Sequence, residues 1–157
     1  MAKSSREQIV KDERMVISEL VKNGRIGFGE ISKACGFSRQ KIWRIVKRLE
    51  KNKTILGYHT VVDNEKLGLE RFLIMVSTRG DFDFEVLTDI IAEIKSLGVT
   101  VNGSSITHGT YDWVLDVTTD GGIKAIKKCE WKIYDMQGQV IRKIKILQVL
   151  VDHPISV

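Results

Sequence analysis

Several residue and segment types are scarce in this chain, and each scarcity excludes a class of protein. One proline in 157 residues, together with 43% hydrophobic residues, argues against a disordered or proline-rich linker protein. No apolar run reaches the length of a membrane-spanning helix, and the N-terminal stretch MAKSSREQIVKDER lacks the hydrophobic region of a secretion signal. We therefore expect a globular cytoplasmic protein without a membrane span.

Cysteine is scarce as well. Cys35 and Cys129 are the only two and form no CxxC pair, so no disulfide framework is expected and a reducing cytoplasm is the simplest setting. The alternative is a metal site that combines a cysteine with His59, His108 or His153, but none of these residues has the spacing of metal ligands. Neither a metal site nor a bound cofactor is predicted.

The positive charge of the chain is concentrated in one short segment. Residues 38–53 hold seven Lys and Arg side chains and one acid, Glu50, which gives a net +6 in a chain whose total is +5. Ser38 is typical of a helix N-cap. The apolar positions after it are spaced i, i+3, i+4 and i+7, and they are Ile42, Ile45, Val46 and Leu49. This pattern predicts an amphipathic helix with one packing face and one cationic face.

Two shorter apolar patterns precede the cationic helix. Residues 12–24 predict a helix that ends at Gly24, and residues 29–36 predict a short helix that ends at Gly36. Glycine is favoured at such ends because it takes the left-handed backbone conformation at little cost. A short helix, a tight glycine turn and a basic helix are together typical of a helix-turn-helix. Ser32 is small enough to let the two helices cross.

Lys and Arg on the exposed face of such a helix suit DNA phosphates, and its leading residues, Arg39 and Gln40, can reach base edges in the major groove. Trp43 has two interpretations, as a partly buried support of the helix or as a contact to a sugar or a thymine methyl group. An ordinary solvated charged face is the alternative for the whole set. The predicted DNA-binding residues are Ser38, Arg39, Gln40, Lys41, Trp43, Arg44, Lys47, Arg48 and Lys51.

The second part of the chain follows a different rhythm. Residues 55–63 are typical of a strand and residues 64–70 of a turn, so we divide the chain into a DNA-binding domain with a connecting strand, 1–63, and a second domain, 64–157. The second domain is predicted to contain strand 71–80, helix 82–98, strands 99–109 and 110–121, helix 122–138 and strand 139–151. The order βαββαβ predicts a ferredoxin-like αβ-sandwich, with both helices on one face of an antiparallel sheet. The fold class is therefore α+β.

Two of the predicted strands also indicate an oligomer. FLIMV at 72–76 and the end of 143–151 are apolar on both alternations, which is typical of strands covered on both faces. Two helices cover only one face of a four-stranded sheet, so we expect a second copy of the chain on the other face, in a homodimer or a higher homo-oligomer. The alternative is a monomer whose N-terminal domain folds over the sheet.

From about Lys11 to Val151 the chain resembles the Lrp/AsnC family of transcription regulators, also called feast/famine regulators. The resemblance rests on NGRIGFGEISKACGFSRQKIWRIVKRLEKNKTILGYHTVVDNEKLGL, on the element order after it, and on ITHGTYDWVLDV. One departure is YDMQGQV before the last strand, where the family commonly has a leucine-proline-glycine-valine turn. The resemblance implies a sequence-specific regulator that binds double-stranded promoter or operator DNA and forms dimers or larger oligomers.

The resemblance also implies an effector site at the turn THGTYD. In resembling proteins the equivalent glycine-x-tyrosine-aspartate turn helps line an amino-acid site between sensing domains. Gly109 lets backbone approach a ligand closely, and Asp112 can accept hydrogen bonds from an α-ammonium group. The alternative is a plain strand connection in which Asp112 binds turn amides and Tyr111 packs. The predicted effector-binding residues are Thr107, His108, Gly109, Thr110, Tyr111 and Asp112.

Two other functions compete with regulation. A small ferredoxin-like enzyme is one, since His108, Tyr111 and Asp112 could perform acid–base chemistry. However, no nucleophile with its base, no phosphate loop and no metal motif is recognisable, so we do not expect an enzyme. A sequence-blind DNA-packaging protein is the other, and it would use the same cationic helix. Preference for one promoter fragment over bulk DNA distinguishes a regulator from a packaging protein.

Overall fold

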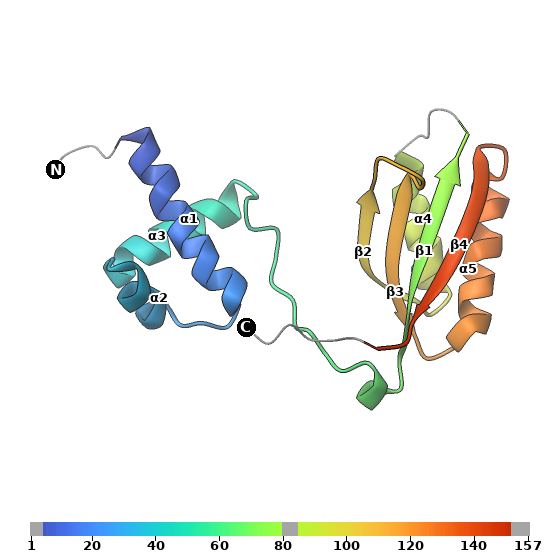
Figure 1. Ribbon diagram of the computed structural model, residues 1–157, viewed down its shortest axis with the longest axis horizontal. Helices are drawn as coiled ribbons and strands as arrows, with labels where there is room; N and C mark the ends of the chain where they lie inside the picture. Colours follow the sequence, from blue (N-terminus) through green and yellow to red (C-terminus); the bar gives the residue numbers. More distant parts are fainter. Residues whose placement is uncertain (1–4, 80–84, 152–157) are drawn as a thin grey trace. The chain divides into compact units, whose positions relative to one another are not determined.

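The computed structural model describes residues 5–79 and 85–151, and the chain divides into two compact units between Val61 and Val62. The first unit contains three helices, α1 Arg6–Lys22, α2 Phe28–Cys35 and α3 Arg39–Lys51 (Figure 1). The second contains a short 3-10 helix at Glu65–Leu67, the strands β1 Glu70–Thr78, β2 Thr100–Ile106, β3 Trp113–Thr119 and β4 Ile141–Val149, and the helices α4 Glu85–Ser96 and α5 Gly122–Gln137.

The first unit begins and ends its first helix with polar caps. The Ser5 hydroxyl accepts a hydrogen bond from the backbone N–H of Gln8 at 3.2 Å, which caps the start of α1. The prediction that Gly24 caps the end of α1 is wrong. Asn23 is the cap residue, and its side-chain oxygen accepts from the Arg25 N–H at 2.9 Å, so an Asx turn ends the helix one residue earlier. The helices enclose a small core of buried Val16, Ile31, Cys35, Ile42, Ile45, Val46 and Leu49.

Residues 55–63 form no strand, contrary to the prediction. A strand needs a neighbouring strand to exchange N–H and C=O hydrogen bonds, and no described residue of the first unit lies in a strand. Ile55 instead donates its N–H to the Leu49 carbonyl at 3.0 Å, which closes the end of α3. Leu56 and Val61 lie exposed. Alternation of apolar residues indicated extended backbone there, but nothing in the first unit pairs with it.

The second unit has the predicted βαββαβ order. Its four strands lie in the order β2-β3-β1-β4 with every neighbouring pair antiparallel, and both helices lie on one face of the sheet (Figure 1). The α+β fold with a ferredoxin-like second half is thus confirmed. Residues 80–84, which the predicted strand 71–80 and helix 82–98 include in part, lie outside the described residues. The core combines Phe72, Ile74, Val76, Trp113, Leu115 and Val117 of the strands with Leu87, Ile90, Ile94, Ile126, Cys129 and Ile133 of the helices.

The opposite face of this sheet carries neither α4 nor α5. Side chains alternate along β1, so Leu73 and Met75 point away from the buried positions and remain half-buried in the single chain. Arg71 donates to both carboxylate oxygens of Asp116, at 2.9 and 2.6 Å, in the midst of these residues. We call this surface the open sheet face, and define it by Arg71, Leu73, Met75, Val114, Asp116, Leu147 and Val149.

Candidate nucleic-acid interface and effector turn

Local hydrogen bonds hold the turn between α2 and α3. Gly36 ends α2 in the left-handed conformation, with φ +68°, as its position in the sequence predicts. The Phe37 N–H donates to the Ser32 carbonyl at 3.1 Å, and the Ser32 hydroxyl donates in return to the Phe37 carbonyl. Ser32 therefore does more than leave room for the helices to cross, because its hydroxyl ties the two sides of the turn together.

Helix α3 presents the two faces that its sequence predicts. Ser38 caps its start by accepting from the Lys41 N–H at 3.2 Å, and the apolar stripe from Ile42 to Leu49 is buried. Trp43 is 51% exposed, so it is partly buried and still has accessible surface, which is compatible with both of its interpretations. The exposed residues of the predicted set are Ser38, Arg39, Gln40, Trp43, Arg44, Lys47, Arg48 and Lys51.

Lys41 differs from the rest because its ammonium group has a buried partner. It lies 2.6 Å from Oδ2 of Asp12 on α1, and it also lies over the Phe37 ring, 3.7 Å from the centroid. Asp12 is only 4% exposed, and Gln8 donates to its other oxygen at 2.7 Å. The hydrogen bond from Lys41 lowers the pKa of Asp12, against the effect of burial. The Lys41 head group therefore joins α3 to α1.

Two further cations of α3 have carboxylate partners. Arg48 Nε donates to Glu13 Oε1 of α1 at 2.8 Å, and Lys47 Nζ donates to Glu50 Oε2 at 2.8 Å. The hydrogen bond between Lys47 and Glu50 raises the pKa of the lysine and lowers that of the glutamate. Tyr58 donates from its hydroxyl to the other oxygen of Glu50 at 3.2 Å. These pairs lie at the surface, so they hold the side chains only loosely.

The remaining cations of the segment keep their charge available. Arg39, Arg44, Lys51 and Lys53 make no ion pair with any described residue. The Arg39 guanidinium lies against the first turn of α2, since a Cβ added at Gly29 would be 3.0 Å from its Nη2 atom. Asp12 and Glu13 bring two negative charges to a segment of net +6, so the local excess falls to +4.

The turn between β2 and β3 is tied to the neighbouring strand. Asp112 Oδ2 accepts from the backbone N–H of Thr78 at 2.7 Å and from its hydroxyl at 3.0 Å, and the Asp112 N–H donates to the Val76 carbonyl. Thr107 closes the turn through its N–H, which donates to the Asp112 carbonyl at 2.9 Å. The carboxylate of Asp112 thus bonds to β1, not to turn amides as the plain-connection alternative supposed.

The tip of this turn faces open space. Thr107, His108, Gly109 and Thr110 are exposed, whereas Tyr111 is half-buried. Gly109 has φ +150°, a backbone conformation that residues with a side chain rarely adopt. No atom lies within 4 Å of a Cβ added there, so the space beside it is open. The tip is therefore accessible to a small molecule. One carboxylate oxygen of Asp112 is already engaged in hydrogen bonds to Thr78.

The cysteines lie in the two cores. Cys35 and Cys129 are free thiols, and burial raises the pKa of Cys129 to about 11. Within residues 5–79 and 85–151, the structure brings together no group of three His, Cys, Asp or Glu side chains that could hold a metal ion. The helices of the same residues include none with the length and apolar content to span a bilayer.

Comparison with known proteins agrees with this geometry. Residues 13–55 match the family model described as winged helix-turn-helix DNA-binding. The leucine-responsive regulatory protein of Haemophilus influenzae is 29% identical over 100 residues, which are 64% of this chain. This chain covers 60% of the length of that relative.

Solved structures extend the likeness to both units. The leucine response regulatory protein LrpA of Mycobacterium tuberculosis has a TM-score of 0.68 at 18% identity, with 90% of this chain and 92% of that chain covered. A feast or famine regulatory protein of M. tuberculosis complexed with L-methionine has a TM-score of 0.66 at 20% identity, with the same coverage. At these identities the two structures show a shared fold.

The chain is similar to regulators of the Lrp/AsnC type. The likeness consists of the matched helix-turn-helix segment, the sequence relative and a shared two-part fold. Two residues that bear on the candidate interface were not predicted from the sequence, namely Asp12 and Glu13. A signal existed for Asp12, because it lies on the apolar stripe of α1, three residues after Ile9 and four before Val16. An acid at such a position is expected to have a buried cationic partner.

Proposed function

We propose that this protein is a sequence-specific, DNA-binding transcription regulator, and that α3 is its recognition helix. The observation that carries the proposal is the exposed face of α3, which follows a hydrogen-bonded glycine turn and presents cations together with the amide of Gln40. The matched winged helix-turn-helix segment supports it. A binding role of this kind calls for no catalytic group, and it places the protein in the cytoplasm with the DNA.

Within this proposal the nine predicted residues divide by their intramolecular contacts. Arg44 and Lys51 are the first candidates for phosphate contacts, since both are exposed and neither makes an ion pair with a described residue. Arg39 and Gln40 lie at the start of the helix, where side chains reach base edges. Lys41 is the weakest candidate, because a phosphate would have to compete with the buried carboxylate of Asp12.

The experiment is a salt titration of DNA affinity. A duplex selected by the protein from a random library is compared with a shuffled duplex of the same composition, each at several salt concentrations. Arg44→Ala should weaken binding to both duplexes and reduce the slope of log affinity against log salt by about one. Gln40→Ala should instead reduce the difference between the two duplexes, by about 1–3 kcal/mol if it contacts a base.

Lys95→Ala is the matched control, because it removes one exposed lysine of α4 in the second unit and changes the net charge equally. Its slope should equal that of wild type. Equal affinity of wild type for the selected and shuffled duplexes would favour a packaging protein instead. An unchanged slope for Arg44→Ala would remove the exposed face of α3 from the interface.

We also propose that the second unit assembles the protein and senses an amino acid. The open sheet face, with half-buried Leu73 and Met75, suits a second copy of the chain. The tip of the turn at residues 107–112 suits the amino acid, since Gly109 and Thr110 leave backbone N–H groups accessible to a carboxylate. A feast or famine regulatory protein with the same fold is known in complex with L-methionine, which supports an amino acid as the ligand.

A further inference from the structure

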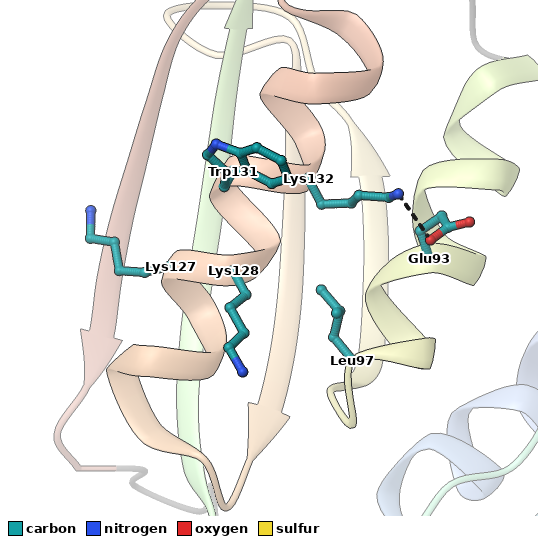
Figure 2. A pocket seen from close by; sticks show the side chains of 6 residues that line it. All are labelled: Glu93, Leu97, Lys127, Lys128, Trp131 and Lys132. Atoms are coloured by element: carbon teal, nitrogen blue, oxygen red, sulfur yellow. Dashed lines mark ion pairs between the residues drawn. The ribbon is translucent and has the colours of Figure 1, made fainter.

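A groove runs between the two helices of the second unit, on the side away from the sheet. It has a volume of about 480 Å³ and is lined by Glu93, Leu97, Lys127, Lys128, Trp131 and Lys132 (Figure 2). Trp131 projects from α5 and is 69% exposed, and Leu97 at the end of α4 is 37% exposed. A tryptophan normally buries most of its large apolar area, so an indole displayed beside an exposed leucine is an apolar surface that a ligand can cover.

The rim of the groove is cationic. Lys132 reaches across to Glu93 of α4, with Nζ and Oε2 3.3 Å apart, and Lys127 pairs with Glu130 at 2.6 Å (Figure 2). Lys128 makes no ion pair with any residue that the structure describes, and neither does Lys124 one turn earlier on α5. Lys128 therefore offers positive charge without a described ion-pair partner about one turn of α5 from Trp131, and such charge attracts carboxylates.

Two other occupants fit these residues poorly. Double-stranded DNA offers no apolar side chain to cover the indole, so it would meet the lysines and leave the apolar surface exposed. A second copy related by a two-fold axis through the groove would place Lys128 against its own equivalent, because such an interface sets the same patch against itself. An acidic peptide with one apolar anchor meets both the charge and the apolar surface.

We propose that the groove between α4 and α5 docks an acidic segment of another protein. One large apolar side chain of that segment lies between Trp131 and Leu97, and its carboxylates face Lys128. The proposal does not depend on the DNA-binding function, since every residue it uses lies in the second unit. It assigns to the helical face of this unit a contact with a partner protein.

The test uses the full chain and a short blocked peptide with a central phenylalanine between two runs of acidic residues. Calorimetry should detect saturable binding that weakens as salt rises. Trp131→Ala and Lys128→Glu should each weaken binding by about tenfold or more. Lys95→Glu, a charge reversal of an exposed lysine outside the groove, should change affinity by less than about twofold. Circular dichroism should show all three variants folded as wild type.

Several results would overturn the proposal. The first is no heat of binding at a peptide concentration of about 1 mM. The second is that a peptide with amides in place of the carboxylates, or with serine in place of phenylalanine, binds as tightly as the original peptide. The third is that Lys95→Glu and Lys128→Glu lose the same amount of peptide affinity. A lower oligomer mass of Trp131→Ala in light scattering would assign the groove to a second copy. A loss of DNA affinity in Lys128→Glu that Lys95→Glu does not share would assign it to nucleic acid.

Discussion

The ion pair between Lys41 and Asp12 should be a principal source of stability in the first unit. Lys41→Met keeps most of the side-chain stem and removes the ammonium group, which leaves a carboxylate with 6% side-chain exposure and Gln8 as its remaining described donor. Breaking a buried pair in this way costs about 3–5 kcal/mol when both partners are fully buried. The Lys41 side chain is 38% exposed and Gln8 continues to donate, so we expect about 2–3 kcal/mol.

That loss is large for so small a unit. At about 0.05–0.15 kcal/mol per residue, the three-helix unit as a whole has a free energy of unfolding of only about 3–9 kcal/mol. Hydrogen exchange measured by mass spectrometry is the suitable assay, because it reports peptides of the two units separately in the intact chain. The opening free energy of α1 and α3 should fall in Lys41→Met, while peptides of the sheet should exchange as in wild type.

The pH dependence has a definite sign. The pKa of Asp12 is lowered in the folded chain, so the pair stabilises the fold at pH values above the ordinary range of an aspartate and this contribution is lost as pH falls through the lowered pKa. The difference between wild type and Lys41→Met should therefore be constant from about pH 5 to 8 and shrink in acid. Adding Asp12→Asn to Lys41→Met should restore about 1 kcal/mol or more, because no buried charge is then left alone.

Lys51→Met is the matched control, since this lysine is exposed at the end of the same helix and makes no ion pair with the described residues. It should change the opening free energy by about 0.5 kcal/mol at most. Wild-type exchange of α1 and α3 in Lys41→Met at neutral pH would refute the reasoning. A double variant less stable than Lys41→Met would also refute it, because the cost would then come from lost packing.

Two further predictions concern the second unit. Light scattering of wild type should give at least twice the 17.8 kDa mass of one chain. Leu73→Glu on the open sheet face should lower this mass, whereas the control Val21→Glu, at an exposed position of α1, should not. A wild-type mass of 17.8 kDa would contradict the assembly. One of the standard amino acids, at about 1 mM, should raise the melting temperature of wild type but not of Asp112→Ala, through a coupling of about 1–3 kcal/mol. Asp112→Ala should also melt earlier without ligand because Thr78 loses its acceptor, while equal stabilisation of both proteins would place the pocket elsewhere.

Local signals in the sequence were enough to predict most of the fold. The ends of α2 and α3 follow from Gly36 and Ser38, because helix caps depend on residues only a few positions apart. The βαββαβ order follows from periodicities of the same short range. The segment 55–63 shows the limit of such signals, since its alternation is typical of a strand but a strand also needs a partner that the sequence pattern does not supply.

The candidate site divides in the same way. Sequence alone determined that the charged segment after Ser38 forms a helix with a buried stripe and a cationic face that ends at Asn52, because charge and apolar spacing along one helix are local properties. Only the tertiary structure decided which charges remain available for the proposed contact with DNA. Asp12 and Glu13 of α1 form ion pairs with Lys41 and Arg48 of α3. Asp112, just before β3, accepts a hydrogen bond from Thr78 at the end of β1. Such contacts join residues far apart in the chain, so they depend on how the elements pack and not on the order in which they occur.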